Sequence, residues 1–111
     1  MKKVSTDAME QVAEYFRALA EPRRLRLLSE LRQAERSVGQ LVEALGATQS
    51  NVSKHLEVLF DAGLLARERR GTSTIYRIAE AETLQLCDLV CGNVARIAAR
   101  RAGRDAGLGG G

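Results

Sequence analysis

The sequence predicts a mainly α-helical domain with one small β-hairpin, in the order helix-helix-helix-helix-strand-strand-helix. Three observations predict this fold. Apolar residues recur at helical spacing in five segments, glycines stand where helices should end, and one strand-forming stretch folds back around Gly71-Thr72. A chain of 111 residues forms one domain. Because only 4% of the residues are aromatic, aliphatic side chains must build the core, and dimerisation would add buried surface.

The first helix is predicted over residues 6–19, after a loose basic tail at residues 1–5. Ser5 or Thr6 can cap its first turn through a side-chain hydroxyl. An apolar stripe at helical spacing gives it one face that must be covered. The stripe comprises Met9, Val12, Ala13, Phe16 and Leu19.

The second helix is predicted over residues 22–33, because Glu21-Pro22 marks a break and proline suits the first helical position. We expect this helix to bury Leu25, Leu28 and Leu31. Three arginines, Arg23, Arg24 and Arg26, are expected on its exposed side. Either they are solvated beside carboxylates, or one or two of them contact phosphate.

The third and fourth helices form a helix-turn-helix. Ser37 caps the third helix, whose core face is Val38, Leu41, Val42 and Leu45, and Gly46 ends it. After a short turn, Thr48 caps the fourth helix, and Gly63 closes it. The compact turn matters because the first helix of such a pair braces the second against DNA.

The fourth helix has two distinct faces. Val52, Leu56, Leu59 and Phe60 form the apolar face. At the start of the helix, short polar side chains and one lysine can bond base edges and phosphates. These candidate DNA contacts are Gln49, Ser50, Asn51, Ser53 and Lys54.

Two strands, residues 64–70 and 73–78, follow the fourth helix and form a basic hairpin. Its arginines stand on the side of the tip, where a phosphate backbone can pass. The hairpin candidates are Arg67, Arg69, Arg70 and Thr72. A helix with a polar start, followed by an arginine hairpin, is typical of a winged helix-turn-helix that binds double-stranded DNA.

The last helix is predicted over residues 79–102. Its apolar stripe has no obvious place in the core of one chain and comprises Leu84, Cys87, Val90, Cys91, Val94, Ile97 and Ala98. We therefore divide the chain into a DNA-binding and dimerisation domain at residues 1–103 and a glycine-rich, disordered tail at residues 104–111.

The net charge of +3 permits nucleic acid as a partner, and its distribution favours it. Residues 22–36 hold five arginines against two acidic residues, and residues 48–77 hold five basic against three acidic residues. No signal peptide and no apolar run of about 20 residues is found, so we expect a soluble, cytoplasmic protein with no membrane partner.

No arrangement of side chains predicts an enzyme. His55 is the single histidine, lies at the edge of the apolar face and has no other metal-ligand type close in sequence. We interpret it as a packing or phosphate-contacting residue. Ser50 and Ser53 have no recognisable base and acid partners for nucleophilic catalysis, and we expect no catalytic residues.

The helix-turn-helix and hairpin resemble the ArsR/SmtB family of bacterial transcriptional repressors over roughly residues 8–100. The residues that carry the resemblance are Ser50, Ser53, His55, Leu56, Leu59, Gly63, Leu64, Leu65, Arg69, Gly71 and Tyr76, together with the segment ALAEPRRLRLLSEL from Ala18 to Leu31. The resemblance implies a homodimer that pairs through its first and last helices, binds a palindromic operator and releases it when an inducer binds.

Cys87 and Cys91 are the candidate sensor, because the family resemblance implies an inducer site and the chain offers few others. They stand one turn apart on the same helix face. They either chelate a thiophilic metal or metalloid ion, with four thiolates shared across the two-fold axis, or react with a reactive sulfur or oxygen species. The remaining interpretation is that both are small apolar residues of the dimer interface.

This chain departs from the family's known sensors. The family's cysteine-x-cysteine motif is absent from SVGQLVEAL, residues 37–45, and the histidine and acidic zinc ligands are absent from the last helix. A direct disulfide between residues four apart on a helix is unfavourable, because their Cβ atoms lie ~5–6 Å apart and a disulfide needs ~3.5–4.5 Å.

We therefore predict a homodimeric, DNA-binding transcriptional regulator, an inducer-responsive repressor with a possible thiol or metal sensor at the cysteine pair. Two alternatives stay open. The winged helix could serve protein–protein contact with DNA binding lost, or the regulator could have no metal or thiol effector.

Overall fold

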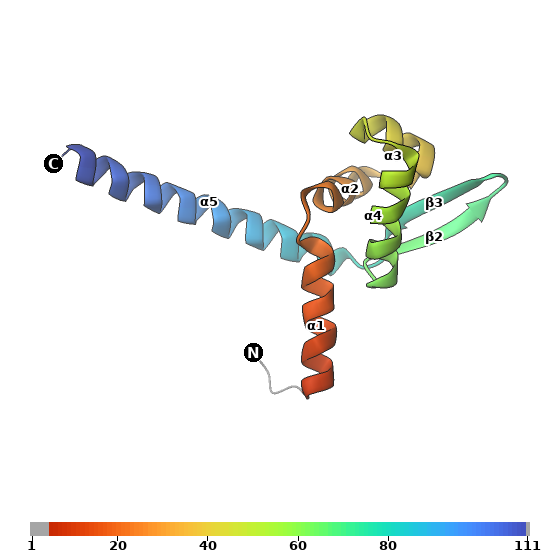
Figure 1. Ribbon diagram of the computed structural model, residues 1–111, viewed down its shortest axis with the longest axis horizontal. Helices are drawn as coiled ribbons and strands as arrows, with labels where there is room; N and C mark the ends of the chain where they lie inside the picture. Colours follow the sequence, from red (N-terminus) through yellow and green to blue (C-terminus); the bar gives the residue numbers. More distant parts are fainter. Residues whose placement is uncertain (1–4, 111) are drawn as a thin grey trace. The chain divides into compact units, whose positions relative to one another are not determined.

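The computed structural model describes residues 5–110, with side chains described through Arg104. The chain divides into two units, Met1–Glu80 and Ala81–Gly111, which we describe separately. The first contains α1 (Thr6–Leu19), α2 (Pro22–Gln33), β1 (Arg36–Ser37), α3 (Val38–Leu45), α4 (Gln49–Asp61), β2 (Leu65–Arg70) and β3 (Ser73–Ile78), and the second is α5 (Ala81–Gly110) (Figure 1). The expected winged helix-turn-helix is confirmed.

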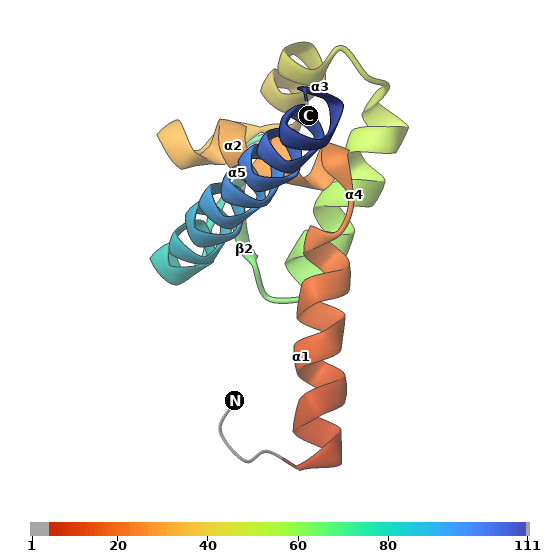
Figure 2. The ribbon, with the colours of Figure 1, turned by 90° about the vertical axis from the view of Figure 1, so that its left-hand side faces the viewer.

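Helix α1 contacts the rest of the first unit through its C-terminal end. Ser5 caps it by accepting a hydrogen bond from the backbone N–H of Ala8, at 3.2 Å. Ala18, near the other end, is buried. The N-terminal part of α1 extends away from α2 and α4 (Figure 2). The apolar side chains there, Met9, Val12 and Phe16, are exposed.

Helix α2 begins at Pro22, as the sequence predicts, and buries Leu27, Leu28 and Leu31. The expectation that Leu25 is buried is wrong, because 44% of its surface is exposed. At 100° per residue, the arc through the three buried leucines excludes Leu25. A stripe read at i, i+3 alone does not distinguish the two arrangements.

Helices α3 and α4 are capped at both ends of the turn that joins them. Ser37 and Gln40 form a reciprocal capping box at the start of α3. Gly46 ends α3 in the left-handed conformation, with φ of 62°, which a Cβ would strain. Thr48 then accepts a hydrogen bond from the backbone N–H of Asn51 and begins α4. The tight turn therefore fixes where α4 starts.

The sheet has three antiparallel strands in the order β1-β3-β2. The predicted hairpin is confirmed, with Leu65 opposite Ile78 and Arg70 opposite Ser73. The sequence analysis missed β1, which places Arg36 opposite Tyr76. Two residues give no alternation of apolar and polar side chains, so periodicity does not reveal such a strand.

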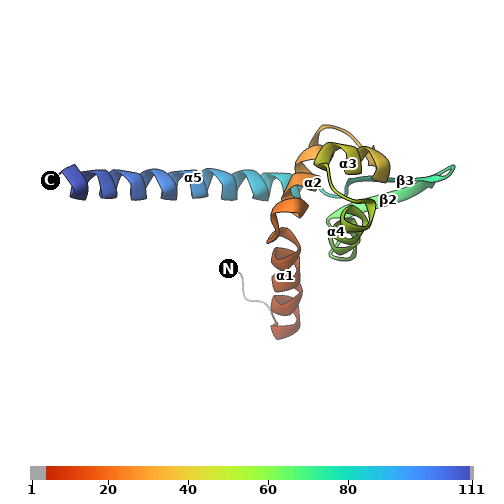
Figure 3. The ribbon, with the colours of Figure 1, turned by 45° about the horizontal axis from the view of Figure 1, so that its top comes forward.

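The core of the first unit lies between α2, α3, α4 and the base of the hairpin. Its fully buried side chains are Leu27, Leu41, Val52, Leu56, Leu59 and Leu64. Figure 3 shows the three helices grouped together and the β2–β3 hairpin projecting beyond them. This aliphatic core holds α4 and the hairpin on one rigid support.

Helix α5 spans 30 residues, which corresponds to about 45 Å of helix. It starts at Ala81 and continues to Gly110, past residue 102 where the sequence analysis ends it. The predicted disorder of residues 104–111 stays a prediction, because the side chains from residue 105 and all of Gly111 lie outside the described residues. None of the helices described over residues 5–110 is long and apolar enough to cross a membrane.

Candidate nucleic-acid interface

The predicted DNA contacts on α4 lie together at its exposed N-terminal end. Gln49, Ser50 and Lys54 are exposed, and Asn51 and Ser53 are half-buried. The first turn holds no acidic residue, and the helix dipole makes this end attractive to anions. The opposite face of α4 is fully buried in the core, so the polar residues are presented to solvent in a fixed orientation.

Arg23 of α2 contacts the exposed end of α4. Its Nη1 donates to Oδ1 of Asn51 at 2.7 Å, although the two residues lie 28 positions apart in the sequence. The bond is charge-assisted because the donor is a guanidinium, and such bonds are stronger than neutral ones. A predicted base-contacting residue is therefore already held by a neighbouring helix.

Arg24 joins three helices. Its guanidinium donates to the carbonyl oxygens of Ala18, at 2.7 Å, and Arg17, at 3.1 Å, which end α1. It also lies 3.2 Å from Nδ1 of His55 on α4. Because arginine has no acceptor, Nδ1 must accept this bond, and the proton of the neutral ring lies on Nε2. Nε2 faces Glu21 at 4.0 Å. The expectation of a solvent-exposed Arg24 is wrong, since it is half-buried.

Charges around this junction shift both titratable partners. Burial lowers the pKa of His55, and the cations Arg24, Lys54 and Arg23 lower it further, against an opposing effect of Glu21. Burial raises the pKa of Glu21, but hydrogen bonds from the backbone of Arg24 and Arg23 and the nearby positive charges bring it below its usual value. His55 is thus a packed residue with 12% of its side chain exposed, and its lowered pKa favours the neutral ring.

Arg67 lies on β2 of the β2–β3 hairpin, which is the wing of the fold, and it is bonded to α4. Its Nη1 donates to Oε2 of Glu57 at 2.7 Å and to the hydroxyl of Tyr76 at 3.3 Å, and its guanidinium stacks 3.8 Å from the centre of the Phe60 ring. The hydrogen bonds with Tyr76 and Glu57 raise the pKa of Arg67. These contacts tie β2 to the C-terminal half of α4, away from its polar start.

Arg70 is paired with acidic residues. It donates two hydrogen bonds to Glu35, the shorter at 2.5 Å, and it also pairs with Glu68. The bond from Arg70 lowers the pKa of Glu35. All of these side chains are at least 42% exposed, so water screens the pairs and a phosphate can compete for the guanidinium.

Arg69 and Thr72 are the available side chains of the hairpin tip. Both are exposed. Arg69 donates from Nε to the carbonyl oxygen of Gly71 at 3.2 Å, and within residues 5–104 it pairs with no acidic side chain. This carbonyl contact leaves the charge of Arg69 free to meet an anion.

The two cysteines lie one turn apart on α5. Cys91 is exposed, Cys87 is half-buried, and neither takes part in a disulfide. Val90 and Val94 beside them are about half exposed. Within the part of the chain that the structure describes, no three His, Cys, Asp or Glu residues come close enough to hold a metal ion. One chain therefore supplies at most two thiolates to such a site.

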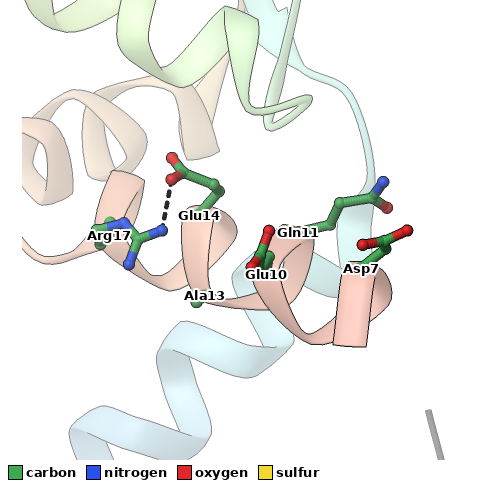
Figure 4. A pocket seen from close by; sticks show the side chains of 6 residues that line it. All are labelled: Asp7, Glu10, Gln11, Ala13, Glu14 and Arg17. Carbon is green, nitrogen blue, oxygen red and sulfur yellow. Dashed lines mark hydrogen bonds and ion pairs between the residues drawn. The ribbon is translucent and has the colours of Figure 1, made fainter. Parts of the chain in front are cut away.

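A surface hollow along α1 is not a ligand site. Its lining comes from this single helix, as the side chains of Figure 4 show, and a single helix encloses nothing. Glu14 in this hollow pairs with Arg17. Asp7 and Glu10 make the rest of the surface acidic, which opposes DNA rather than attracting it.

These features define the class of protein as a winged helix-turn-helix, and comparisons with known proteins identify the family. Residues 21–67 match the bacterial regulatory proteins of the arsR family. The HTH-type transcriptional regulator NmtR of Mycobacterium tuberculosis is 40% identical over 77% of this chain and 71% of that protein.

Solved structures support the same fold and family. The crystal structure of Rv0081 from M. tuberculosis is similar with a TM-score of 0.80 and 36% identity, over 88% of this chain and 99% of that one. The solution structure of the homodimeric winged helix-turn-helix domain Mb0332 from Mycobacterium bovis has a TM-score of 0.77 and 34% identity, over 88% and 94%. The chain belongs to the ArsR family and is a DNA-binding transcriptional regulator, not an enzyme.

Sequence reasoning missed the roles of Arg23 and Arg24. It placed both on an exposed face, but both bond residues of α4. No spacing rule connects side chains 28 and 31 positions apart. One weak indication was available. Both arginines lie in the first turn of α2, a helix that must pack against the helix-turn-helix, so contacts with α4 could have been expected.

Proposed function

We propose that this protein is a homodimeric repressor that binds a roughly palindromic operator. The two α4 helices would enter successive major grooves about one helical turn apart. The observation that carries this proposal is the exposed, acid-free polar start of α4 above a fully buried opposite face. Because the proposed partner is operator DNA, we infer that the protein acts in the cytoplasm.

The contacts divide between groove and backbone. We assign base-edge and phosphate contacts in the major groove to Gln49, Ser50, Asn51, Ser53 and Lys54. Arg69 and Thr72 of the hairpin tip contact the phosphate backbone, and Arg70 joins them when a phosphate displaces Glu35. His55 and Arg67 hold α4 in place, as their bonds within the chain support.

Exposed apolar side chains support the dimer. Met9, Val12 and Phe16 of α1 are between 39% and 50% exposed, and Leu89, Val90 and Val94 of α5 are between 48% and 70% exposed. Water disfavours so many large apolar groups on two helices. A second copy of this chain would cover them, and the related Mb0332 domain is a homodimer.

Hydroxyl-radical footprinting on the DNA upstream of the protein's own gene tests this proposal. We expect two protected regions on one face of the duplex, about one helical turn apart, and a reporter gene behind this DNA that is silenced by the protein. A single protected region would contradict the dimer, and increased transcription would contradict repression. A protein that protects no DNA at all would have lost DNA binding.

We also propose that Cys87 and Cys91 form the effector site, as a thiophilic metal or metalloid site or as a target of reactive sulfur or oxygen species. Their spacing and the exposure of Cys91 support this proposal. Two thiolates from each protomer would complete a four-ligand site at the two-fold axis, and metal binding would release the thiol protons. An effector there would change the angle between the two α4 helices.

Mass spectrometry tests the effector site. The reduced protein is treated with thiophilic metal ions and, separately, with a polysulfide donor. We expect one agent to add mass to the wild-type protein and none to add mass to the Cys87→Ser/Cys91→Ser variant. Unmodified, metal-free cysteines under every condition would show that the pair only packs in the interface.

A further inference from the structure

We propose that Arg23, which lies outside the recognition helix, determines which base Asn51 reads. This inference rests on the proposed function, because it assumes that the start of α4 enters the major groove. Arg23 is a positioning residue: it acts through the amide of Asn51. The bond that carries the inference is the 2.7 Å contact from Arg23 Nη1 to Asn51 Oδ1.

The guanidinium fixes the orientation of the Asn51 amide. An asparagine amide can usually rotate to exchange its oxygen and its NH₂ group, because both ends find partners in water. Arginine has donors only. An amide facing Arg23 must therefore present its oxygen to the guanidinium and direct its NH₂ group away from it.

The junction beside this bond makes it durable. Arg24, the next residue of α2, is bonded to two carbonyl oxygens at the end of α1 and to His55, one turn along α4 from Asn51. These bonds hold the start of α2 against α4. The backbones that carry Arg23 and Asn51 are thus kept at a set separation, and the side-chain bond needs little further ordering.

A held oxygen changes the base that Asn51 prefers. A free asparagine bonds adenine with both ends of its amide, accepting from N6 and donating to N7. With Oδ1 occupied, an approaching adenine N6–H₂ group would meet the donors of Arg23. The outward NH₂ group suits guanine instead, since guanine presents two acceptors, N7 and O6, in the major groove. Asn51 should therefore select guanine over adenine.

Selection from a random duplex library with the purified full chain tests this inference. Asn51→Ala first locates the base pair that depends on Asn51. At that pair the wild type should prefer guanine over adenine by about fivefold or more. Arg23→Ala should reverse this preference toward adenine, because the released amide can bond adenine at both ends.

Two variants separate orientation from charge. Arg23→Lys keeps a side chain with donors only and should keep guanine. Arg26→Ala removes the same charge from an exposed position of the same helix and should lower affinity without changing the preferred base. In the free protein, Arg23→Ala should shift the side-chain NH₂ resonances of Asn51 in a ¹⁵N spectrum, and Arg26→Ala should leave them in place.

Each outcome either supports or overturns the inference that Arg23 sets the base that Asn51 reads. A wild type that prefers adenine at the Asn51-dependent pair, an unchanged preference in Arg23→Ala, or the lack of any such pair would overturn the inference while operator binding stands. Unshifted Asn51 resonances in Arg23→Ala would overturn it without reference to DNA. If the wild type enriches no sequence at all, the proposed function fails first, and the inference falls with it.

Discussion

Wing arginines that look equivalent in the sequence occupy different situations in the fold. Arg67 is stacked on Phe60 and bonded to Glu57, and Arg70 is paired with Glu35. Among residues 5–104, the guanidinium of Arg69 donates a hydrogen bond only to a carbonyl oxygen of its own turn. A cation that already has partners gains less from a phosphate. The hairpin should therefore contribute to DNA binding mainly through Arg69.

Removing Arg69 should weaken DNA binding uniformly across sequences. We expect Arg69→Ala to reduce the slope of log affinity against log salt by about 0.9, which is the counterion release of one phosphate contact. Fluorescence anisotropy between 50 and 200 mM salt measures this slope, with the range chosen to resolve it.

Arg67→Ala is the matched comparison. It should leave the salt slope unchanged and lower the midpoint of urea unfolding, because it removes the contacts that join β2 to α4. If Arg67→Ala flattens the slope and Arg69→Ala does not, the assignment of the two residues is reversed.

His55 makes stability depend on pH. Its pKa is lowered in the fold, so between the ordinary histidine value of ~6.5 and the folded value the unfolded chain binds a proton that the folded chain does not. The contribution of His55 to the free energy of unfolding is complete above that pH window and is lost as the pH falls through it.

We expect the free energy of unfolding to fall between pH 7.5 and pH 5.5 in the wild type, and to fall less in His55→Gln, which keeps an acceptor for Arg24. Urea titrations at the two pH values measure both. Equal decreases would show that His55 does not carry the pH dependence.

At the level of residues, the sequence predicts side-chain roles only where the partner is near in the chain. Ser37 with Gln40 and Thr48 with Asn51 were predictable, because capping works over three residues. Arg24 with His55 and Arg23 with Asn51 were not, because packing of distant elements brings these pairs together.

Among the elements, α4 begins at a side-chain cap that also supports the DNA contacts. Thr48 satisfies one of the free N–H groups of the turn that carries the DNA contacts. We expect Thr48→Ala to lower the free energy of unfolding by about 1 kcal/mol and to weaken operator binding as the first turn frays.

Thermal unfolding at fixed protein concentration checks this value, since 1 kcal/mol corresponds to roughly 4–8 °C in a domain near 100 residues. Thr48→Ser preserves the hydroxyl and should behave as the wild type. A Thr48→Ala variant with an unchanged melting temperature would mean that another group caps α4.

Element boundaries were predictable where glycine, proline or a cap residue marks them. Pro22, Gly46 and Gly63 stand at the predicted ends of helices. Strand β1 and the extension of α5 beyond residue 102 were not predictable, because a two-residue strand has no period and a glycine-rich sequence favours no helix. The burial of Leu25 in α2 was mispredicted because several leucines at helical spacing allow two stripes, while Leu28 and Leu31 are buried as predicted.

At the level of the whole molecule, the proposed function requires a second copy of the chain. We expect Val94→Glu to disfavour the dimer, because the charge would be buried against apolar side chains. Sedimentation should show monomers, and operator affinity should fall at least about tenfold, since two linked α4 helices bind far more tightly than one.

Gln85→Glu places the same charge at an exposed polar position of α5 and should leave the dimer intact. A Val94→Glu variant that remains dimeric and binds tightly would place the interface elsewhere.

The most direct measurement is the affinity of the reduced protein for the DNA upstream of its own gene, by fluorescence anisotropy, against shuffled DNA of equal length. We expect tight, salt-dependent binding to the upstream DNA and at least about tenfold weaker binding to shuffled DNA. We also expect thiophilic metal ions or a polysulfide donor to weaken the binding of the wild-type protein to the upstream DNA. The same agents should leave the binding of the Cys87→Ser/Cys91→Ser variant unchanged. Equal binding to both DNAs would show that α4 does not read an operator.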